Sequence, residues 1–160
     1  MKYFTSYYAK YSMIPKTYMC VAISRTWPVS LESNQNFTAV KNNFLAPSAE
    51  LLNDMKSGLL NEDEYTKRYI TEVMTRVRSD QKCQDLYEWI KKVEKTYATF
   101  QVRYDAIVFM CYEKPGDFCH RHLLARLLTN IYGVECTELA FQKQDKPAET
   151  SDTADTISLF

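Results

Sequence analysis

The sequence predicts a single α/β domain with a small, mostly parallel sheet and flanking helices in three layers. Two runs, YMCVAIS (18–24) and YDAIVFMC (104–111), are almost uncharged, as expected for strands that are buried on both faces. A strand, a helix and a second strand also follow one another over residues 104–139. Such a βαβ unit implies parallel pairing and a right-handed crossover.

The first part of the chain predicts two strands. KYFTSYY (2–8) is rich in aromatic and β-branched residues and predicts the first strand, and residues 18–24 form the second. The segment between them contains Pro15 and is expected to be a short connection. Residues 25–36 are expected to form an irregular loop.

The middle of the chain predicts helices. In APSAELLNDMKSG (46–58), Ser48 is suited to cap a helix start and Gly58 to end the helix. Residues 61–77 and 79–97 each place apolar side chains on one face at helical spacing. These stripes predict core packing rather than contacts with a cofactor.

The last part of the chain completes the βαβ unit. Asp117 is expected to cap the helix after the third strand, Gly133 to end it, and VECTEL (134–139) to form the last strand. The following residues are polar and contain few core formers. We therefore predict one domain over residues 1–140 and a mobile polar tail over residues 141–160.

The composition excludes several classes of protein. Twenty acidic residues balance 20 basic ones, which argues against broad electrostatic capture of nucleic acid or of an anionic membrane. No apolar run is long enough to span a membrane, and the first residues lack the apolar core of a signal peptide, so we expect a cytoplasmic protein. With only three glycines, the chain has no P-loop and no dinucleotide fingerprint. The five cysteines are expected to be reduced thiols.

Reactive side chains are concentrated in CYEKPGDFCHRHLL (111–124), between the end of a strand and the start of a helix. A helix N-terminus lowers the pKa of a thiol such as Cys119 and attracts anions. Arg121 adds a guanidinium suited to phosphate or carboxylate, and His120 can exchange a proton near neutral pH. Glu113 is suited to act as a base, as a nucleophile or as an acceptor for sugar hydroxyls.

The loops at 24–28 and 111–121 both follow strands, so they meet if those strands are parallel neighbours. Because ligands of parallel sheets bind beyond the strand ends, we place the candidate site where these two loops meet. Two alternatives stay open: Cys111 as a buried core thiol, and Arg121 as a structural clamp paired with Asp117 or Glu113. The predicted catalytic residues are Glu113, Cys119 and His120. The predicted ligand-binding residues are Ser6, Arg25, Trp27, Cys111, Lys114 and Arg121.

No metal and no cofactor are expected. The segment offers four possible metal ligands: Cys111, Cys119, His120 and His122. However, neighbouring residues on a helix diverge by about 100°, and the chain has no C-x-x-C pair.

Three stretches resemble the family called domain of unknown function 488: KYFTSYYAK, LAPSAELL and CYEKPGDFCHRHLLARLL. The resemblance runs from Met1 to about Leu139. It implies a small cytosolic α/β protein of the kind found in bacteria, archaea and their phages. It also implies that the family's Cys-Glu and Cys-His-Arg elements fall on Cys111, Glu113, Cys119, His120 and Arg121. It implies no established activity.

The functional prediction is a pocket for a small anionic ligand, nucleotide-like, at the Cys-His-Arg helix start. One alternative is an enzyme that acts on a nucleotide or sugar phosphate; the other is a protein that binds or sequesters a nucleotide without turnover, as a phage anti-defence protein would. The sequence leaves open which applies. A nucleic-acid-binding module is a third alternative, based on the aromatic residues and Arg103 in TYATFQVRY (96–104), and zero net charge argues against it. No membrane partner is expected.

Overall fold

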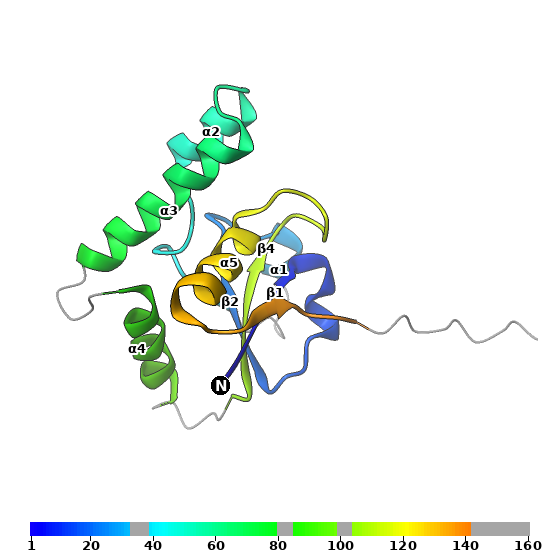
Figure 1. The fold of residues 1–160 in the computed structure, drawn as a ribbon. Coiled ribbons are helices and arrows are strands. Elements are labelled where there is room, and N and C mark those ends of the chain that lie inside the picture. The colour runs from blue at the N-terminus through cyan, green and yellow to red at the C-terminus, as the bar shows by residue number, and fades with distance from the viewer. Residues whose placement is uncertain (33–38, 80–84, 99–103, 142–160) are drawn as a thin grey trace, which may run out of the picture.

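The computed structural model describes residues 1–32, 39–79, 85–98 and 104–141. Its centre is a five-stranded sheet in the order β3-β2-β4-β1-β5, in which every neighbouring pair is parallel (Figure 1). The α/β prediction is confirmed, and the sheet is parallel throughout. The strands are β1 (Lys2–Tyr7), β2 (Tyr18–Ala22), β3 (Ala39–Lys41), β4 (Ala106–Cys111) and β5 (Cys136–Glu138).

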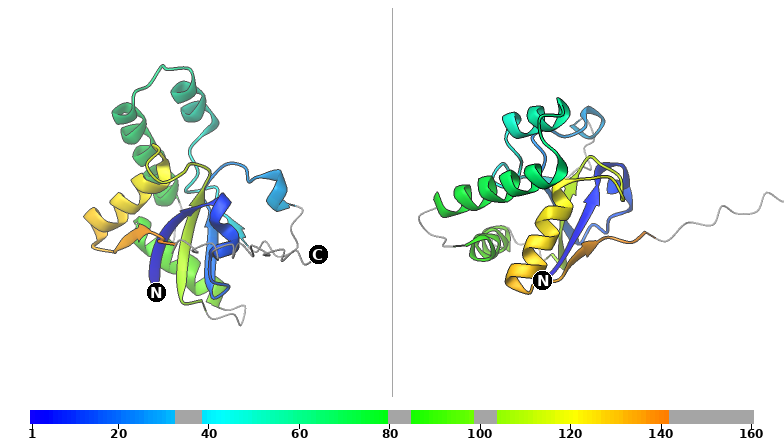
Figure 2. Two further views of the ribbon diagram at one scale, coloured as in Figure 1. Left: turned by 90° about the vertical axis from the view of Figure 1, so that its right-hand side faces the viewer. Right: turned by 45° about the horizontal axis from the view of Figure 1, so that its top comes forward.

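Helices lie on both faces of this sheet, as the two further views show (Figure 2). One face packs against the longer helices α3, α4 and α5, and the other against the 3-10 helix η1 and the short helix α1. The helical elements are η1 (Tyr8–Met13), α1 (Val29–Glu32), α2 (Ala49–Lys56), α3 (Glu62–Ser79), α4 (Leu86–Ala98) and α5 (His120–Tyr132).

Strand β4 divides the core into two halves. All of its residues are buried, and they alternate between the two faces. Ile107 and Phe109 join the larger cluster under α3 and α5, whereas Val108 and Met110 join the smaller cluster under η1. This double burial explains why the run carries no charge.

Most predicted elements are confirmed, and the exceptions are short. The four predicted strands correspond to β1, β2, β4 and β5, and Ser48 caps α2 by accepting a 3.0 Å hydrogen bond from the Leu51 amide. The connection after the first strand contains the 3-10 helix η1, and the predicted irregular loop contains the short helix α1, so both predictions were wrong there. The edge strand β3 was not predicted. These elements span six, four and three residues, too few for a periodic pattern.

The prediction that Asp117 caps α5 was wrong. The N-cap is Cys119, whose backbone is extended, with φ −151° and ψ 140°. The Asp117 amide instead donates to the Lys114 carbonyl at 3.3 Å and closes a turn around Gly116, where φ is +93°. The helix thus begins later than predicted, but it ends at Gly133 in the left-handed conformation, as expected.

The parallel sheet brings the ends of β1, β2 and β4 to one edge, where the start of α5 also lies (Figure 1). Ligands of open parallel sheets bind beyond this carboxyl edge. Within the described residues, no helix is long and apolar enough to cross a membrane. The predicted tail lies outside the described residues from residue 142 onward.

Candidate functional site

Two buried thiols share one carboxylate at the carboxyl edge. Cys111 is the last residue of β4 and Cys119 is the N-cap of α5, and they are only 1% and 3% exposed. Each S–H donates to the same oxygen, Oε2 of Glu113, with both S···O distances at 3.0 Å. The strand end, the loop and the helix start therefore form one cluster, which we call the thiol cluster: Cys111, Glu113, Cys119 and His120.

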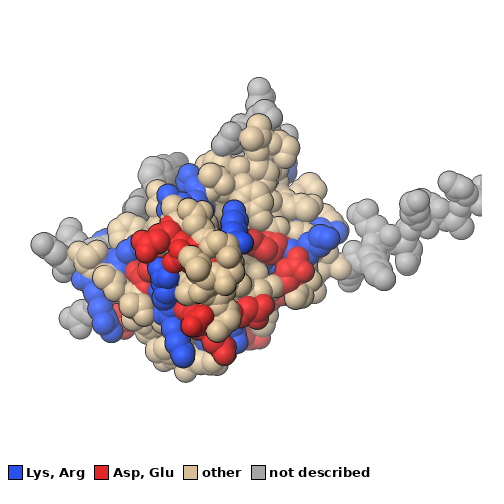
Figure 3. Space-filling model, turned by 90° about the horizontal axis from the view of Figure 1, so that it is seen from above, with Lys and Arg blue, Asp and Glu red and all other residues tan. Residues whose placement is uncertain are grey.

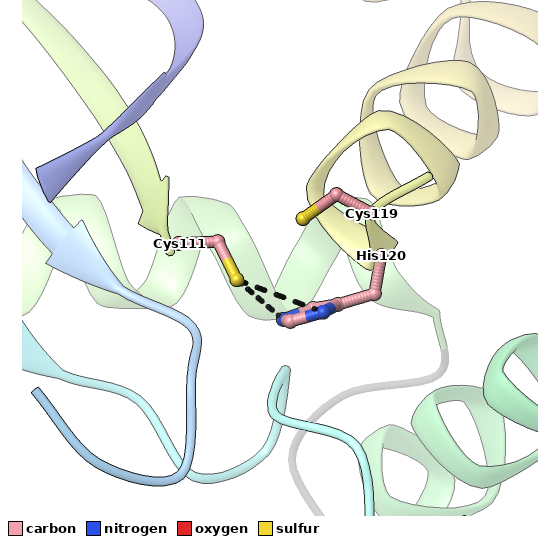
Figure 4. Close-up of side chains that lie close together, drawn as sticks. All are labelled: Cys111, Cys119 and His120. Atoms are coloured by element: carbon pink, nitrogen blue, oxygen red, sulfur yellow. Dashed lines mark hydrogen bonds between the residues drawn. The ribbon is translucent and has the colours of Figure 1, made fainter. Parts of the chain in front are cut away.

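The imidazole of His120 completes the thiol cluster, and its orientation is fixed. Its Nε2 lies 2.8 Å from the carbonyl oxygen of Ile23, just after β2. A carbonyl only accepts hydrogen bonds, so Nε2 carries a proton and donates it to Ile23. The Cys111 sulfur lies 3.7 Å from Nδ1 and 3.6 Å from Nε2, and the two side chains point toward each other (Figure 4).

The two thiols titrate in opposite directions. The Cys111 thiol, as a hydrogen-bond partner of an ionised Cys119, contributes most to lowering the Cys119 pKa; the contact with His120 adds to this effect, whereas burial and the charge of Glu113 oppose it. The pKa of Cys111 is raised by its hydrogen bond to Cys119 and by burial. Burial alone would raise the pKa of Glu113, but the thiol donors Cys119 and Cys111 outweigh it and lower that pKa. Of the two thiols, Cys119 is therefore the more acidic, and Glu113 is held in its ionised form.

Arg121 clamps the loop to the last strand. Its side chain is completely buried, and its Nε and Nη2 bind the two carboxylate oxygens of Glu138 on β5 at 3.2 and 3.3 Å. Its Nη1 donates to the backbone oxygen of Glu113 at 2.6 Å, and its guanidinium lies 5.9 Å from the centre of the Tyr7 ring. The contact with Glu113 agrees with the alternative in which Arg121 is a structural clamp, although it is made to the backbone oxygen of Glu113. Ligand binding by Arg121 stays a prediction.

Glu138 was missed by sequence reasoning. It also accepts a 2.5 Å hydrogen bond from Thr5 and lies 3.3 Å from Nε2 of His122. Burial would raise its pKa, but the bonds from His122, Thr5 and Arg121 hold the pKa at about 2. Only the pairing of β1 with β5, which sets Thr5 opposite Glu138, would have indicated this role.

The two predicted loops do meet. Tyr112 of the second loop lies 3.2 Å, oxygen to oxygen, from Thr26 of the first, and the Ile23 carbonyl holds His120. Arg25 and Lys114 are exposed on these two loops. Trp27 is half-buried against the smaller core, with the Lys41 ammonium 6.0 Å from the centre of its ring.

Ser6 lies apart from the thiol cluster. It pairs with Met110 on the sheet face that packs under η1, whereas Cys111 belongs to the face under α5. Its hydroxyl is the one buried side-chain N or O atom without a hydrogen-bond partner in the described part of the chain. The structure therefore does not bring Ser6 together with the predicted catalytic residues.

The donor atoms of Cys111, Cys119 and His120 lie within 4.8 Å of one another, close enough for one metal ion to contact all three. The expectation that Cys119 and His120 diverge was wrong, because Cys119 precedes the first helical turn and has an extended backbone. The S–H bonds to Glu113 give both thiols a partner within the protein. The absence of a metal stays a prediction.

Comparison with protein families identifies the family of the chain. The family model DUF488-N3a, described as the active DUF488-N3 subclade, matches residues 7–131. The chain belongs to this family. The matched range contains the whole thiol cluster, and it ends before Glu138. Searches of curated proteins and of solved structures found no match to the chain.

Proposed function

We propose that this DUF488-N3a protein is a cysteine-dependent enzyme that acts on a small anionic molecule of the nucleotide or sugar-phosphate type. The observation that carries the proposal is the thiol cluster: two thiols on one carboxylate oxygen, with an oriented imidazole beside them. A core needs no such arrangement, since an apolar side chain would fill the same space without buried polar groups. The family description as an active subclade agrees with this reading.

Cys119 is the proposed nucleophile. It sits at the start of α5, where free backbone N–H groups favour a thiolate, and its pKa is lowered by the hydrogen bond from Cys111 and by His120. Glu113 already accepts the Cys119 proton in a hydrogen bond, so it is placed to take that proton. His120 faces Cys111 and is proposed to act as a second acid or base, which gives a proton to the thiol cluster or takes one from it.

A balanced reaction follows from these roles. Glu113 takes the proton of Cys119, the sulfur forms a bond to an electrophilic carbon of the substrate, and the bond from that carbon to the leaving group breaks. The leaving group keeps the electron pair and receives the proton from Glu113. Water then attacks the same carbon and gives one proton to Glu113, which returns it to the departing thiolate. The net reaction is a hydrolysis.

An anionic substrate is favoured by the surroundings. The N-terminus of α5 attracts negative charge, and Arg25 and Lys114 add exposed cations on the two loops that meet there. Positive and negative side chains are interspersed on the face in Figure 3, without a broad patch of one sign. This distribution favours a small anion over nucleic acid.

The test is a thermal-shift screen of nucleotides and sugar phosphates, followed by mass spectrometry of each stabilising compound after incubation with the protein. We expect at least one compound to be converted. Cys119→Ala should lower turnover by roughly 10³-fold or more and still bind the compound. Cys20→Ala, at a buried cysteine within β2, is the matched control and should keep full turnover.

Two outcomes would contradict the proposal of a cysteine-dependent enzyme. A ligand that binds tightly and is recovered unchanged would favour the alternative of a sequestering protein. Turnover that survives in Cys119→Ala but is lost in Glu113→Gln would move the reactive group to the carboxylate.

A further inference from the structure

A cavity of about 440 Å³ lies at η1 and α1, on the sheet face opposite the thiol cluster. Its walls come from the residues that follow three neighbouring strands: Tyr8 after β1, Pro28 after β2 and Tyr112 after β4. It therefore lies at the carboxyl edge, where ligands of parallel sheets bind. Its size is in the range of small-molecule sites, roughly 300–1,000 Å³.

The walls are mainly aromatic and apolar, and they also include Ser12 and Ser30. Tyr8, Tyr11 and Tyr112 line the cavity together with Pro28 and Leu31, and no charged side chain is among the lining residues. Such a surface favours a flat, uncharged group over a phosphate, because rings stack on aromatic faces and a phosphate would lack a counter-charge.

The aromatic walls are held in place by hydrogen bonds. Ser24 donates its hydroxyl proton to the Thr26 carbonyl, so at 2.6 Å it is Tyr8 that donates to the Ser24 oxygen. The rings of Tyr8 and Tyr112 meet edge to face, with centres 5.0 Å apart and planes at 76°. Tyr112 is nevertheless 42% exposed, which leaves part of its ring available to a ligand.

Tyr112 links the cavity to the chemistry. It stands between Cys111 and Glu113 in the chain, and these two side chains belong to the thiol cluster while the Tyr112 ring lines the cavity. A ligand that contacts the Tyr112 ring would thus contact the segment that carries Cys111 and Glu113.

We infer that this cavity is the subsite for the planar ring of the substrate, with Tyr112 as the stacking residue that sets specificity for a nucleobase. The inference rests on the proposed function, since it names the part of a nucleotide-type substrate that lies beside the thiol cluster. The anionic part then lies toward the start of α5 and the two exposed cations, Arg25 and Lys114.

The test compares ligands with and without the ring by isothermal titration calorimetry. The probes are AMP, GMP, CMP and UMP, with ribose 5-phosphate as the ringless reference. At least one nucleotide should bind the wild-type protein more tightly than ribose 5-phosphate. Tyr112→Ala and Tyr112→Leu should each weaken that nucleotide by roughly tenfold or more and leave ribose 5-phosphate unchanged, whereas Tyr112→Phe should keep the affinity.

The matched control is Tyr87→Ala. Tyr87 lines a different cavity, of about 600 Å³, beside the start of β1 at the opposite edge of the sheet. This variant should bind nucleotides as the wild type does. The inference is overturned if no nucleotide binds more tightly than ribose 5-phosphate, if the Tyr112 variants keep the difference, or if Tyr87→Ala removes it.

The same titration in Cys119→Ala separates the inference from the function on which it rests. Ring-dependent binding that persists without turnover in any variant would contradict the enzyme and keep the subsite. Turnover of a ringless sugar phosphate that is insensitive to Tyr112 would keep the enzyme and contradict the subsite.

Discussion

Two pairs of buried cysteines differ in what surrounds them. Cys20 and Cys136 lie within strands β2 and β5, and burial raises the pKa of each thiol to about 12. Cys111 and Cys119 are buried to a similar degree, yet their pKa values move in opposite directions: that of Cys119 is lowered and that of Cys111 is raised. Burial therefore does not decide the reactivity of these thiols. The polar partners of each thiol decide it, because a strand end and a helix start bring carboxylate, imidazole and free N–H groups to the sulfur.

The largest expected effect comes from removing the clamp that holds the thiol cluster against the last strand. Arg121→Met should lower the free energy of unfolding by roughly 3 kcal/mol, because Glu138 and the Glu113 carbonyl lose a buried partner. Chemical denaturation measures the loss. Arg68→Met is the control: Arg68 pairs with Asp54 on the surface of α3, at 39% exposure, and should cost less than roughly 1 kcal/mol.

Equal losses in the two variants would show that Arg121 is not a clamp. A fully stable Arg121→Met protein that no longer binds an anion would return Arg121 to the ligand-binding role that the sequence suggested.

A smaller effect should follow from removing the thiol that assists Cys119. Cys111→Ala takes away the hydrogen bond that contributes most to the lowered pKa of Cys119. Alkylation of Cys119 by iodoacetamide at pH 5, below its pKa of about 6, should therefore slow by roughly tenfold, the effect of about one pKa unit on the thiolate fraction. Cys111→Ser keeps a donor and should slow it less. If Cys20→Ala slows the reaction as much as Cys111→Ala does, the difference between the two pairs is not electrostatic.

A further effect concerns the pH dependence of stability. The folded-state pKa of Glu138 is about 2, below the unfolded value near 4.3, so its carboxylate stabilises the fold above the unfolded pKa. This contribution is lost as the pH falls from about 4.3 toward 2. The melting temperature of Glu138→Gln should thus lie below that of the wild type at pH 6, and the gap should narrow at pH 3. A constant gap would show that packing, rather than charge, is responsible.

Much of the fold could be predicted from the sequence because its long elements carry strong patterns. The uncharged run of β4 and the periodic stripes of α3 and α5 reflect burial that extends over many residues. Strand β3 and helices η1 and α1 are set by their neighbours in the fold, and no local pattern announces them.

The candidate site was predictable where its parts lie close together in the chain. Cys111, Glu113, Cys119 and His120 fall within ten residues, and the structure does bring them together. Glu138 and the Ile23 carbonyl come from other strands, so only the order of strands in the sheet reveals them. Ser6 shows the converse: it is near the end of a strand that borders the site, but strand alternation turns it to the other face.

The central claim is that Cys119 is the reactive thiol of the chain, and competitive alkylation tests it most directly. A Cys83→Ser background restricts the comparison to the four described cysteines, Cys20, Cys111, Cys119 and Cys136. The protein is treated with limiting iodoacetamide at pH 7, with and without EDTA, and read by peptide mass spectrometry. Cys119 should be modified first, at a rate that EDTA does not change, and long before Cys20 and Cys136. Modification of Cys20 or Cys136 before Cys119, or a Cys119 that reacts only after EDTA removes a metal, would contradict it.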